Sequence, residues 1–371
     1  MAVGSSGGHV FPAFAVAEQL EEDFSKKFSK DSSLEIHFVH SGSKLGSELL
    51  SSGSYPVHTI SIGGLAVGQR FLRKIKTLFQ LPIAFFKSVL LIKKIKADVV
   101  FGTGGSATFP VLMAGFFMRK KIAIWEGNTS MGLANKALAI FTSQVFTVFP
   151  QVKGLSHKKQ VWSAYPLRKQ IQQTQTSEKP SVIQESLGQS NFPEKNKFKV
   201  LVLGGSQGSV FLNQAVSQAL KEQEWRKDIF IYHQTGDKSF EELSQKYQLL
   251  EGVFAFAFSK DIQKYYKNCD LIFSRAGSGS VAEMAYCEKA VVLIPLTYSA
   301  GGHQLKNAKW LVSKNCVQMI EEKDFNAKAF QNKILELKQN PSQIKQMAQN
   351  LKSAYQADNK ISSWLLDQLI K

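Results

Sequence analysis

Two glycine-rich turns in this chain combine bare backbone with small polar residues, a composition suited to binding an anion. The first turn is Gly4-Ser5-Ser6-Gly7-Gly8-His9, and the second is Gly204-Gly205-Ser206-Gln207-Gly208-Ser209. Helical periodicity follows each turn, and an apolar strand at 198–203 precedes the second. Backbone N–H groups and the helix dipole at such a junction face an anion, which predicts two similar α/β halves around a phosphate-bearing ligand. A plain strand-to-helix connection is the alternative for either turn.

His9 directly follows the glycines of the first turn. The positive end of a helix favours a neutral imidazole, which can accept a proton near neutral pH. His9 is therefore our candidate for the general base. The alternative is structural, with His9 capping the helix or bonding to a carbonyl group.

Two further clusters in the first half follow apolar runs that are typical of strands. Gly102-Thr103-Gly104-Gly105-Ser106 follows the run 98–101, and Trp125-Glu126-Gly127-Asn128 ends the run 122–125. Open α/β sheets bind ligands at the carboxyl ends of their strands, and glycine permits close approach. A carboxylate beside an amide also suits sugar hydroxyls, which both donate and accept hydrogen bonds. A role for Asn128 in shaping its turn alone is an equal alternative.

The second half contains two more polar segments after apolar runs. The first segment is Ser274-Arg275-Ala276-Gly277-Ser278-Gly279-Ser280. Its small residues leave backbone N–H groups and hydroxyls free to bind a diphosphate. The Glu283 carboxylate that follows is suited to accept hydrogen bonds from ribose hydroxyls. Ser280 and Glu283 fit a capping box equally well. Gly301-Gly302-His303-Gln304 predicts a mobile loop that enters a helix, where Gln304 and Asn307 suit sugar hydroxyls. Surface exposure without a function is the alternative for that loop.

The acidic residues and cysteines show no metal-binding pattern. The chain has no D-x-D pair, so we expect neither a metal ion nor another cofactor, and helix N-termini would stabilise a leaving phosphate. Its three cysteines, Cys269, Cys287 and Cys316, lack CxxC spacing. This argues against a zinc site or a disulfide framework and fits a reducing compartment.

Short apolar strands alternate with longer helical segments, which predicts an α/β protein with parallel sheets. A chain of 371 residues suits two domains. Only Met1-Ala2-Val3 precedes the first turn, whereas a buried strand needs about five residues. Either this strand is stunted, or the start assigned to the chain is late. The other expected strands are 35–39, 98–101, 122–125 and 145–148 in the first half, and 199–203, 229–233, 271–273 and 291–294 in the second.

Composition along the chain predicts the domain boundaries. Residues 171–197 are rich in Gln, Ser, Glu, Lys and Asn and poor in large apolar residues, which is typical of a linker with one short helix. Residues 326–371 show the periodicity of two or three helices. We expect an N-terminal domain at 1–165, a linker at 166–197, a C-terminal domain at 198–345, and helices at 346–371 that pack back on the N-terminal domain.

The net charge of +17 predicts attraction to an anionic surface. Two clusters in the first half mix bulky apolar residues with cations, which favours an anionic membrane surface over nucleic acid, since no nucleic-acid-binding signature is present. We expect no signal peptide, and no apolar run reaches the roughly 20 residues of a membrane span. Core helices with solvated basic faces are the alternative. The expected membrane contacts are Phe71, Lys74, Ile75, Phe79, Phe116, Phe117 and Lys120.

Six segments in this order resemble the MurG family, the UDP-N-acetylglucosamine--N-acetylmuramyl-(pentapeptide) pyrophosphoryl-undecaprenol N-acetylglucosamine transferases. They are GSSGGHVFP from Gly4, GTGGSATFP from Gly102, WEGNTSMGLANK from Trp125, GGSQGS from Gly204, SRAGSGSVAE from Ser274 and HQLKNA from His303. The resemblance implies a GT-B fold, with two Rossmann-like domains whose parallel sheets face each other across a cleft. It implies that the domain at 1–165 binds the acceptor and the membrane, and that the domain at 198–345 binds the UDP-sugar. It implies inverting transfer of N-acetylglucosamine from UDP-GlcNAc to the 4-hydroxyl of the muramyl sugar of lipid I. The product would be lipid II, made peripherally at the cytoplasmic face of the bacterial inner membrane for peptidoglycan synthesis.

The resemblance also implies roles for individual residues. His9 and Glu126 are the candidate bases, with Glu126 in reserve. Ser259 matches a position whose backbone reads uracil, and Glu283 matches a ribose-binding acid. The residues expected to bind the acceptor or a sugar are Gly7, Gly8, Gly104, Gly105 and Asn128. Those expected to bind UDP-GlcNAc are Arg168, Ser206, Gln207, Ser259, Ser278, Gly279, Ser280, Glu283, Gln304 and Asn307.

The chain departs from the family pattern on the acceptor side. Trp125 and Gly127 stand where the family usually has His and Gln, and Tyr165 stands in place of an Asn. Ser5 and Ser6 replace a Gly-Thr pair. Two other functions therefore stay open. One is another GT-B enzyme, such as a diacylglycerol glycosyltransferase or a UDP-GlcNAc epimerase, and the other is a non-catalytic scaffold that binds nucleotide sugar and membrane.

Overall fold

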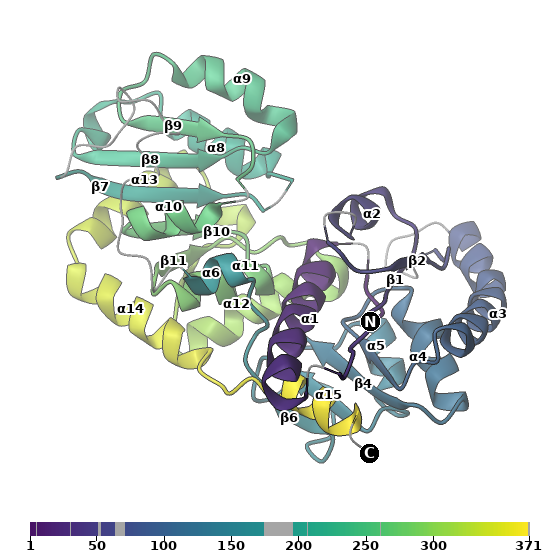
Figure 1. Ribbon diagram of the computed structural model, residues 1–371. Coiled ribbons are helices and arrows are strands. Elements are labelled where there is room, and N and C mark those ends of the chain that lie inside the picture. The colour runs from purple at the N-terminus through teal and green to yellow at the C-terminus, as the bar shows by residue number, and fades with distance from the viewer. Residues whose placement is uncertain are drawn as a thin grey trace. The chain divides into compact units, whose positions relative to one another are not determined.

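The computed structural model describes residues 1–4, 6–29, 31–50, 53–63, 71–173, 196–205, 207–259 and 261–369. These residues form two compact units (Figure 1). Unit 1 comprises Met1–Arg168 and Ala357–Lys371, and unit 2 comprises Lys169–Gln356.

The strands of unit 1 are all parallel and run in two sets, β1-β2 and β3-β4-β5-β6. Ala2 joins the two sets, because it bridges to Val39 of β1 on one side and to Gly102 of β3 on the other. Helices cover both faces of such a sheet, so its strands read as continuous apolar runs. The strands are β1 (Phe38–His40), β2 (Val57–Thr59), β3 (Val99–Gly102), β4 (Lys121–Glu126), β5 (Gln144–Thr147) and β6 (Gln160–Trp162).

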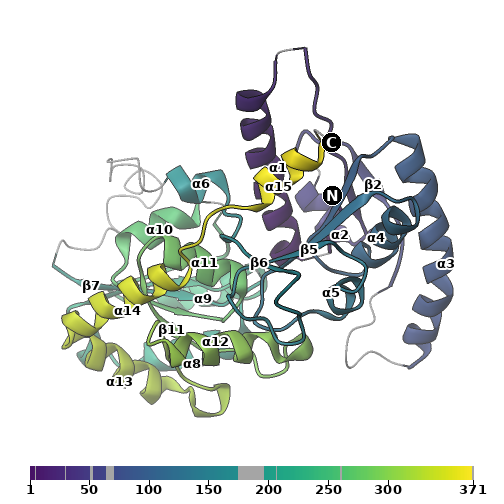
Figure 2. The same cartoon turned by 90° about the horizontal axis from the view of Figure 1, so that it is seen from below.

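The first and last helices of the chain pack together in unit 1 (Figure 2). Along α1, Val10, Ala13 and Ala17 recur at helical spacing and are buried, which makes one apolar face. The hydroxyl of Ser362 on α15 donates a 2.6 Å hydrogen bond to Asp23 on α1. The helices of unit 1 are α1 (Gly7–Lys27), α2 (Lys44–Leu50), α3 (Phe71–Lys94), α4 (Thr108–Phe117), α5 (Leu133–Leu138) and α15 (Ile361–Leu369).

Unit 2 contains a parallel sheet in the order β12-β11-β10-β7-β8-β9, and Figure 1 shows β7, β8 and β9 lying side by side. Val200, Leu201, Val202 and Leu203 of β7 are all buried, so both faces of this central strand are covered. The strands are β7 (Phe198–Leu203), β8 (Ile229–Gln234), β9 (Val253–Phe256), β10 (Leu271–Ser274), β11 (Ala290–Leu293) and β12 (Gln318–Met319).

The helices of unit 2 mostly begin directly after a strand and its polar turn. Ser209 caps α8 by accepting a hydrogen bond from the backbone of Leu212, and Pro341 occupies the first turn of α14. The helices are α6 (Lys169–Gln172), α8 (Val210–Ala219), α9 (Asp237–Tyr247), α10 (Ile262–Asn268), α11 (Ser278–Tyr286), α12 (His303–Ser313), α13 (Ala327–Lys338) and α14 (Pro341–Ala354), with 3-10 helices η3 (Glu224–Arg226), η4 (Ala300–Gly302) and η5 (Glu322–Asp324).

The predicted α/β class with parallel sheets is confirmed, but the strand list needs corrections. Strands β2, β6, β9 and β12 were not expected from the sequence; they have two to four residues and lie at sheet edges. The strand expected at 35–39 begins only at Phe38. Hydrogen bonding to neighbouring segments on both sides begins at this residue, because the Phe38 N–H donates to the Pro56 backbone and the Val39 N–H donates to the Met1 backbone.

Candidate active site

The two glycine turns of unit 1 meet around the imidazole of His9. Gly105 has φ of +93°, and a Cβ atom there would overlap the backbone of Gly4. A Cβ on Gly4 would lie 2.5 Å from His9 Nδ1, and one on Gly104 would lie 3.1 Å from His9 Cδ2. Glycine is therefore required at these positions, because only bare backbone leaves room for both turns and the ring.

The start of α1 fixes the position of His9. The helix begins at Gly7, and the half-buried His9 ring lies in its first turn. His9 Nδ1 is 3.0 Å from the Ser6 hydroxyl, and the backbone oxygen of His9 accepts a 2.8 Å hydrogen bond from Thr103. The imidazole is thus held by its own turn and by the turn after β3.

Glu126, at the end of β4, organises the loop that follows. The whole residue is only 3% exposed. Oε1 accepts hydrogen bonds from the backbone and side-chain amides of Asn128, at 3.1 and 2.9 Å. Oε2 accepts from the Gly132 backbone and the Asn135 side chain, both at 2.9 Å. Four donors therefore occupy this carboxylate and fix Asn128.

Asn135 connects this loop to the glycine turns. Its side-chain nitrogen also donates to the backbone oxygen of Trp125 at 3.0 Å, and it lies 3.5 Å from where a Cβ on Gly104 would be. The structure thus brings His9, Gly104, Glu126 and Asn128 into one contiguous cluster. We did not place Asn135 in the site from sequence, although it is the last amide of the motif WEGNTSMGLANK.

Two of the departures from the family pattern, Trp125 and Tyr165, touch each other. Both are buried, and their ring centroids are 5.2 Å apart at an interplanar angle of 84°. Within the described part of the chain, the indole N–H of Trp125 has no hydrogen-bond partner. Close by in sequence, the guanidinium of Arg168 lies over the Phe11 ring, 5.0 Å from its centroid, so Arg168 belongs to unit 1.

In unit 2, the turn after β7 packs against the turn after β8. Gly208 has φ of +74°, and a Cβ there would overlap the backbone of Thr235. A Cβ on Gly236 would likewise overlap the backbone of Gln207. This close packing fixes the start of α8, while the Gln207 residue is exposed. Ser206, a predicted phosphate contact, lies outside the described residues.

Arg275, which we did not select from the sequence, ties three loops of unit 2 together. The buried guanidinium donates to the Ser209 hydroxyl at 2.8 Å, pairs with Glu322 at 2.7 Å and donates to the backbone of Ile294 at 3.0 Å. Burial lowers the pKa of Arg275, and the charge of Glu322 opposes this shift. Burial raises the pKa of Glu322, but hydrogen bonds from Thr297 and the charge of Arg275 lower it more, so the net shift is downward.

The glycine-serine segment after β10 opens α11. Ser278, Gly279 and Ser280 are the first three residues of the helix, and Gly277 is its N-cap. The capping-box alternative for Ser280 and Glu283 is therefore wrong, because the extended conformation of Gly277 starts the helix before Ser280. Glu283 is half-buried and accepts a 3.4 Å hydrogen bond from the Tyr266 hydroxyl.

The remaining predicted donor-site residues are also held in place. Gln304 Oε1 accepts a 3.0 Å hydrogen bond from the Leu296 backbone. Asn307 is only 1% exposed, so the surface-exposure alternative is wrong for this residue. The Ser259 hydroxyl accepts a 3.1 Å hydrogen bond from the Asp261 backbone. These contacts shape the loops after β11 and β9.

Helix α3 and the end of α4 carry a mixed apolar and basic surface. Phe79, Ile83, Phe86 and Leu90 recur at helical spacing on α3 and are all exposed, with Phe79 at 74%. Around the exposed Phe116 and Phe117, residues of α4 and β4 line a hollow of about 480 Å³. The alternative of core helices with only solvated basic faces is wrong here. Phe71, Lys74 and Ile75 lie on α3, but their side chains fall outside what is described. The cations beside this surface are Lys87, Lys93, Lys94, Arg119, Lys120 and Lys121.

Among the described residues, two features are absent. None of their helices has the length and hydrophobicity required to cross a bilayer. In the same part of the chain, no group of three or more His, Cys, Asp or Glu side chains is arranged to hold a metal ion.

Comparisons with known proteins match both units. The model of the glycosyltransferase family 28 N-terminal domain matches residues 1–147, and that of the C-terminal domain matches residues 199–361. The chain belongs to glycosyltransferase family 28. A family member from Bdellovibrio bacteriovorus, the UDP-N-acetylglucosamine--N-acetylmuramyl-(pentapeptide) pyrophosphoryl-undecaprenol N-acetylglucosamine transferase, is 33% identical over 96% of this chain and 94% of its own length.

Solved structures place this family 28 chain in the GT-B fold. The crystal structure of Acinetobacter baumannii MurG matches with a TM-score of 0.73 and 25% identity, covering 99% of this chain and 97% of that one. The UDP-GlcNAc 2-epimerase from Neisseria meningitidis matches with a TM-score of 0.68 over 100% of this chain and 98% of that one. Its identity is only 12%, so this match concerns the fold alone. The expected GT-B fold and MurG family are confirmed.

Proposed function

We propose that this protein transfers N-acetylglucosamine from UDP-GlcNAc to the 4-hydroxyl of the muramyl sugar of lipid I, forming lipid II for peptidoglycan synthesis. The observation that carries the proposal is the His9 imidazole, held between two glycine turns beside the Glu126–Asn128 loop. Family membership adds support, because the Bdellovibrio bacteriovorus relative is named for N-acetylglucosamine transfer.

Unit 1 would bind the acceptor and supply the base. The acceptor hydroxyl attacks the anomeric carbon of the donor, its proton passes to His9, and UDP leaves with inversion. Gly7, Gly8, Gly104 and Gly105 would provide bare backbone for the approaching sugar. Four donors already occupy the Glu126 carboxylate, which favours His9 as the base and Glu126 as the residue that positions Asn128.

Unit 2 would bind the donor. The N-termini of α8 and α11 offer backbone N–H groups and positive dipole ends to the diphosphate, which gains charge as UDP leaves. The carboxylate of Glu283 would accept the ribose hydroxyls. The other proposed donor contacts are Arg168 from unit 1, Ser206, Gln207, the backbone at Ser259, Ser278, Gly279, Ser280, Gln304 and Asn307. In the proposed reaction, neither the activation of the acceptor nor the departure of UDP uses a metal ion or a cofactor.

The surface on α3 and α4 would hold the protein on the cytoplasmic face of the inner membrane, where lipid I is anchored. Exposed aromatic and aliphatic side chains beside Lys and Arg suit the anionic bilayer interface. Each basic residue close to such a surface contributes about 1 kcal/mol. The hollow at Phe116 and Phe117 combines both kinds of side chain. Phe71, Lys74, Ile75, Phe79 and Lys120 complete the proposed contact surface.

The test is a transfer assay with labelled UDP-GlcNAc and a lipid I analogue in detergent, with and without a chelator. We expect labelled lipid II under both conditions. Replacing His9 by Ala should lower kcat by about a hundredfold or more with little change in the donor KM, because one proton-transfer group is lost. Replacing Glu283 by Ala should instead raise the donor KM. Absence of transfer to lipid I by the wild-type protein would refute the proposed reaction.

A further inference from the structure

The loop between β11 and α12, residues 295–302, lies at the edge of the unit 2 sheet where the proposed donor site is built. In a parallel sheet, the carboxyl ends of all strands meet at one edge. β11 is next to β10, and β10 is next to β7, so along that edge this loop follows the turns that open α11 and α8. Ser259, the proposed uracil contact, follows β9 at the opposite end of the strand order. A donor with its diphosphate at α8 and α11 therefore extends its sugar towards β11.

One largely buried acidic residue, Glu322, fixes the first part of this loop. Its Oε1 pairs with Arg275 at 2.7 Å, and its Oε2 accepts a 2.9 Å hydrogen bond from the Thr297 N–H. The Arg275 guanidinium also donates to the backbone oxygen of Ile294, directly after β11. The ion pair that contacts the start of α8 thus holds the loop at both Ile294 and Thr297.

Two further hydrogen bonds join the loop to the first turn of α12. The Leu296 N–H donates to Gln304 Oε1 at 3.0 Å, and the Gln304 N–H donates to the Ser299 hydroxyl at 3.4 Å. Gln304 is itself a proposed contact of the donor sugar. The backbone on both sides of position 298 is therefore held by residues that belong to the proposed donor site or adjoin it.

Tyr298 lies between these fixed positions and is 93% exposed. A single exposed ring is common on protein surfaces. Here, however, the neighbouring residues in the loop are tied to the groups that we propose for the diphosphate and the sugar. A tyrosine ring presents an apolar face to the C–H groups of a hexose and a hydroxyl to its polar groups. Aromatic side chains of this kind commonly line sites for small ligands.

We propose that the ring of Tyr298 packs against the sugar of the nucleotide-sugar donor, and that Glu322 is the positioning residue that holds the loop for this contact. The inference rests on the proposed function, because it takes the diphosphate to lie at the starts of α8 and α11. Only the sugar makes the contact, so free UDP gains nothing from it. Tyr298 and Glu322 therefore distinguish UDP-GlcNAc from UDP.

Calorimetric binding of UDP-GlcNAc and of UDP to the whole chain tests the contact. Tyr298→Ala should weaken binding of UDP-GlcNAc by about tenfold and change that of UDP by less than about twofold. Tyr298→Phe keeps the ring and should retain most of the affinity for UDP-GlcNAc. The control is Leu249→Ala, which should alter neither affinity, because Leu249 is 90% exposed but precedes β9 at the other edge of the sheet.

The variant Glu322→Gln tests the positioning role, since an amide nitrogen cannot accept the hydrogen bonds of Arg275 and Thr297 together with the remaining oxygen. The ratio of the UDP-GlcNAc affinity to the UDP affinity should fall by about threefold or more. A purely structural role would lower both affinities equally and leave this ratio unchanged. In the double variant with Tyr298→Ala, the ratio should fall by less than the product of the two single effects.

The outcomes separate this inference from the proposed function. Wild-type protein that binds neither UDP nor UDP-GlcNAc would refute the proposed function itself. Wild-type protein that binds both, together with a Tyr298→Ala variant that loses neither affinity or loses both equally, would overturn only the role of Tyr298. A raised KM for the lipid I analogue with unchanged donor binding would place Tyr298 at the acceptor and would overturn it as well.

Discussion

The guanidinium of Arg275 lies 2.7 Å from the carboxylate of Glu322, and both side chains are largely buried. Through this pair, the loop after β10 is joined to the segment that precedes α13. The same guanidinium contacts Ser209 at the start of α8, and Arg275 itself lies just before the start of α11. One arginine therefore lies beside both of the helix N-termini that we propose to bind the UDP diphosphate.

Breaking this ion pair should destabilise unit 2. Replacing Arg275 by Met leaves the buried Glu322 carboxylate without this counter-ion, which should lower the free energy of unfolding by about 3 kcal/mol or more. The double variant Arg275→Met with Glu322→Met should cost less than the sum of the two single changes, since buried partners are coupled. Chemical denaturation measures all four proteins.

An exposed pair in the same unit is the control. Lys352 and Glu288 form a 2.6 Å ion pair, but both side chains are well exposed. Replacing Lys352 by Met should therefore change the free energy of unfolding by less than about 1 kcal/mol. If the double variant loses as much free energy of unfolding as the Arg275 and Glu322 single variants together, the pair is not the structural link we describe.

Glu126 should act by positioning Asn128 rather than by accepting the proton. In the variant Glu126→Gln, the new side-chain nitrogen cannot accept, so two of the four donors lose their acceptor. We expect kcat to fall by about tenfold to a hundredfold, with the limbs of the pH-rate profile unmoved. Asn128→Ala should have an effect of similar kind. Loss of the limb that reports the base would instead identify Glu126 as the proton acceptor.

The exposed apolar surface of α3 and α4 should govern binding to anionic vesicles. Changing both Phe86 and Phe117 to Ser removes two exposed aromatic rings, which should weaken vesicle binding by about tenfold or more. The matched control is Leu249→Ser in unit 2, because Leu249 is 90% exposed and lies outside this surface. Co-sedimentation with vesicles gives the affinities. Equal losses for the double variant and the control would rule out this surface.

His233 should make the stability of unit 2 depend on pH. Its imidazole is fully buried between Tyr247 and Asn213, and burial lowers its pKa to about 3. The unfolded imidazole binds a proton below about pH 6.5, so the unfolded state holds more protons between pH 6.5 and 3. Stability should therefore fall as the pH decreases through this window, by up to about 1.4 kcal/mol per unit from this residue.

Urea denaturation from pH 7.5 to pH 5 measures this dependence. The variant His233→Gln should show a flatter slope below pH 6.5, because it has no titrating ring. His157 is exposed, and His157→Gln should leave the slope unchanged. A wild-type slope retained in His233→Gln would assign the dependence to other groups.

The sequence predicted the long central strands well, because burial on both faces makes their residues continuously apolar. The run 122–125 in β4 and residues 200–203 in β7 are examples. Strand β2, with only Val57–Thr59, has no such run, and its residues are half-buried or exposed. Short edge strands depend on a neighbour for their hydrogen bonds, and the neighbour is not visible in the local sequence.

The candidate site was predictable where glycines and polar residues adjoin a strand end. The contacts between separate segments were not. Gly105 was predicted to lie in the site because it follows a strand, but only the structure shows that its missing side chain makes room for the backbone of Gly4. Arg275 looked like part of a loop, since its partner Glu322 lies in a distant segment without any recognisable pattern. Such pairings depend on how strands are ordered in the sheet.

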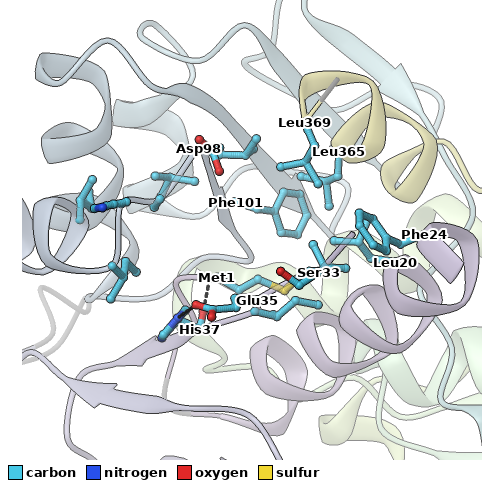
Figure 3. Close-up of a pocket in the computed structure, with 18 of the residues that line it drawn as sticks. Met1, Leu20, Phe24, Ser33, Glu35, His37, Asp98, Phe101, Leu365 and Leu369 are labelled. Atoms are coloured by element: carbon cyan, nitrogen blue, oxygen red, sulfur yellow. Dashed lines mark hydrogen bonds and ion pairs between the residues drawn. The ribbon is translucent and has the colours of Figure 1, made fainter. Parts of the chain in front are cut away.

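The packing of α15 on α1 has a consequence for synthesis of the protein. Asp23 and Lys27 near the end of α1 bond to Ser362 and Asp367 of α15, which are translated more than 300 residues later. The N-terminal half leaves the ribosome first, yet α1 and β3 gain their contacts with α15 only once that helix has been made (Figure 3). A premature stop before α15 would thus remove packing from the half of the enzyme that is made earliest.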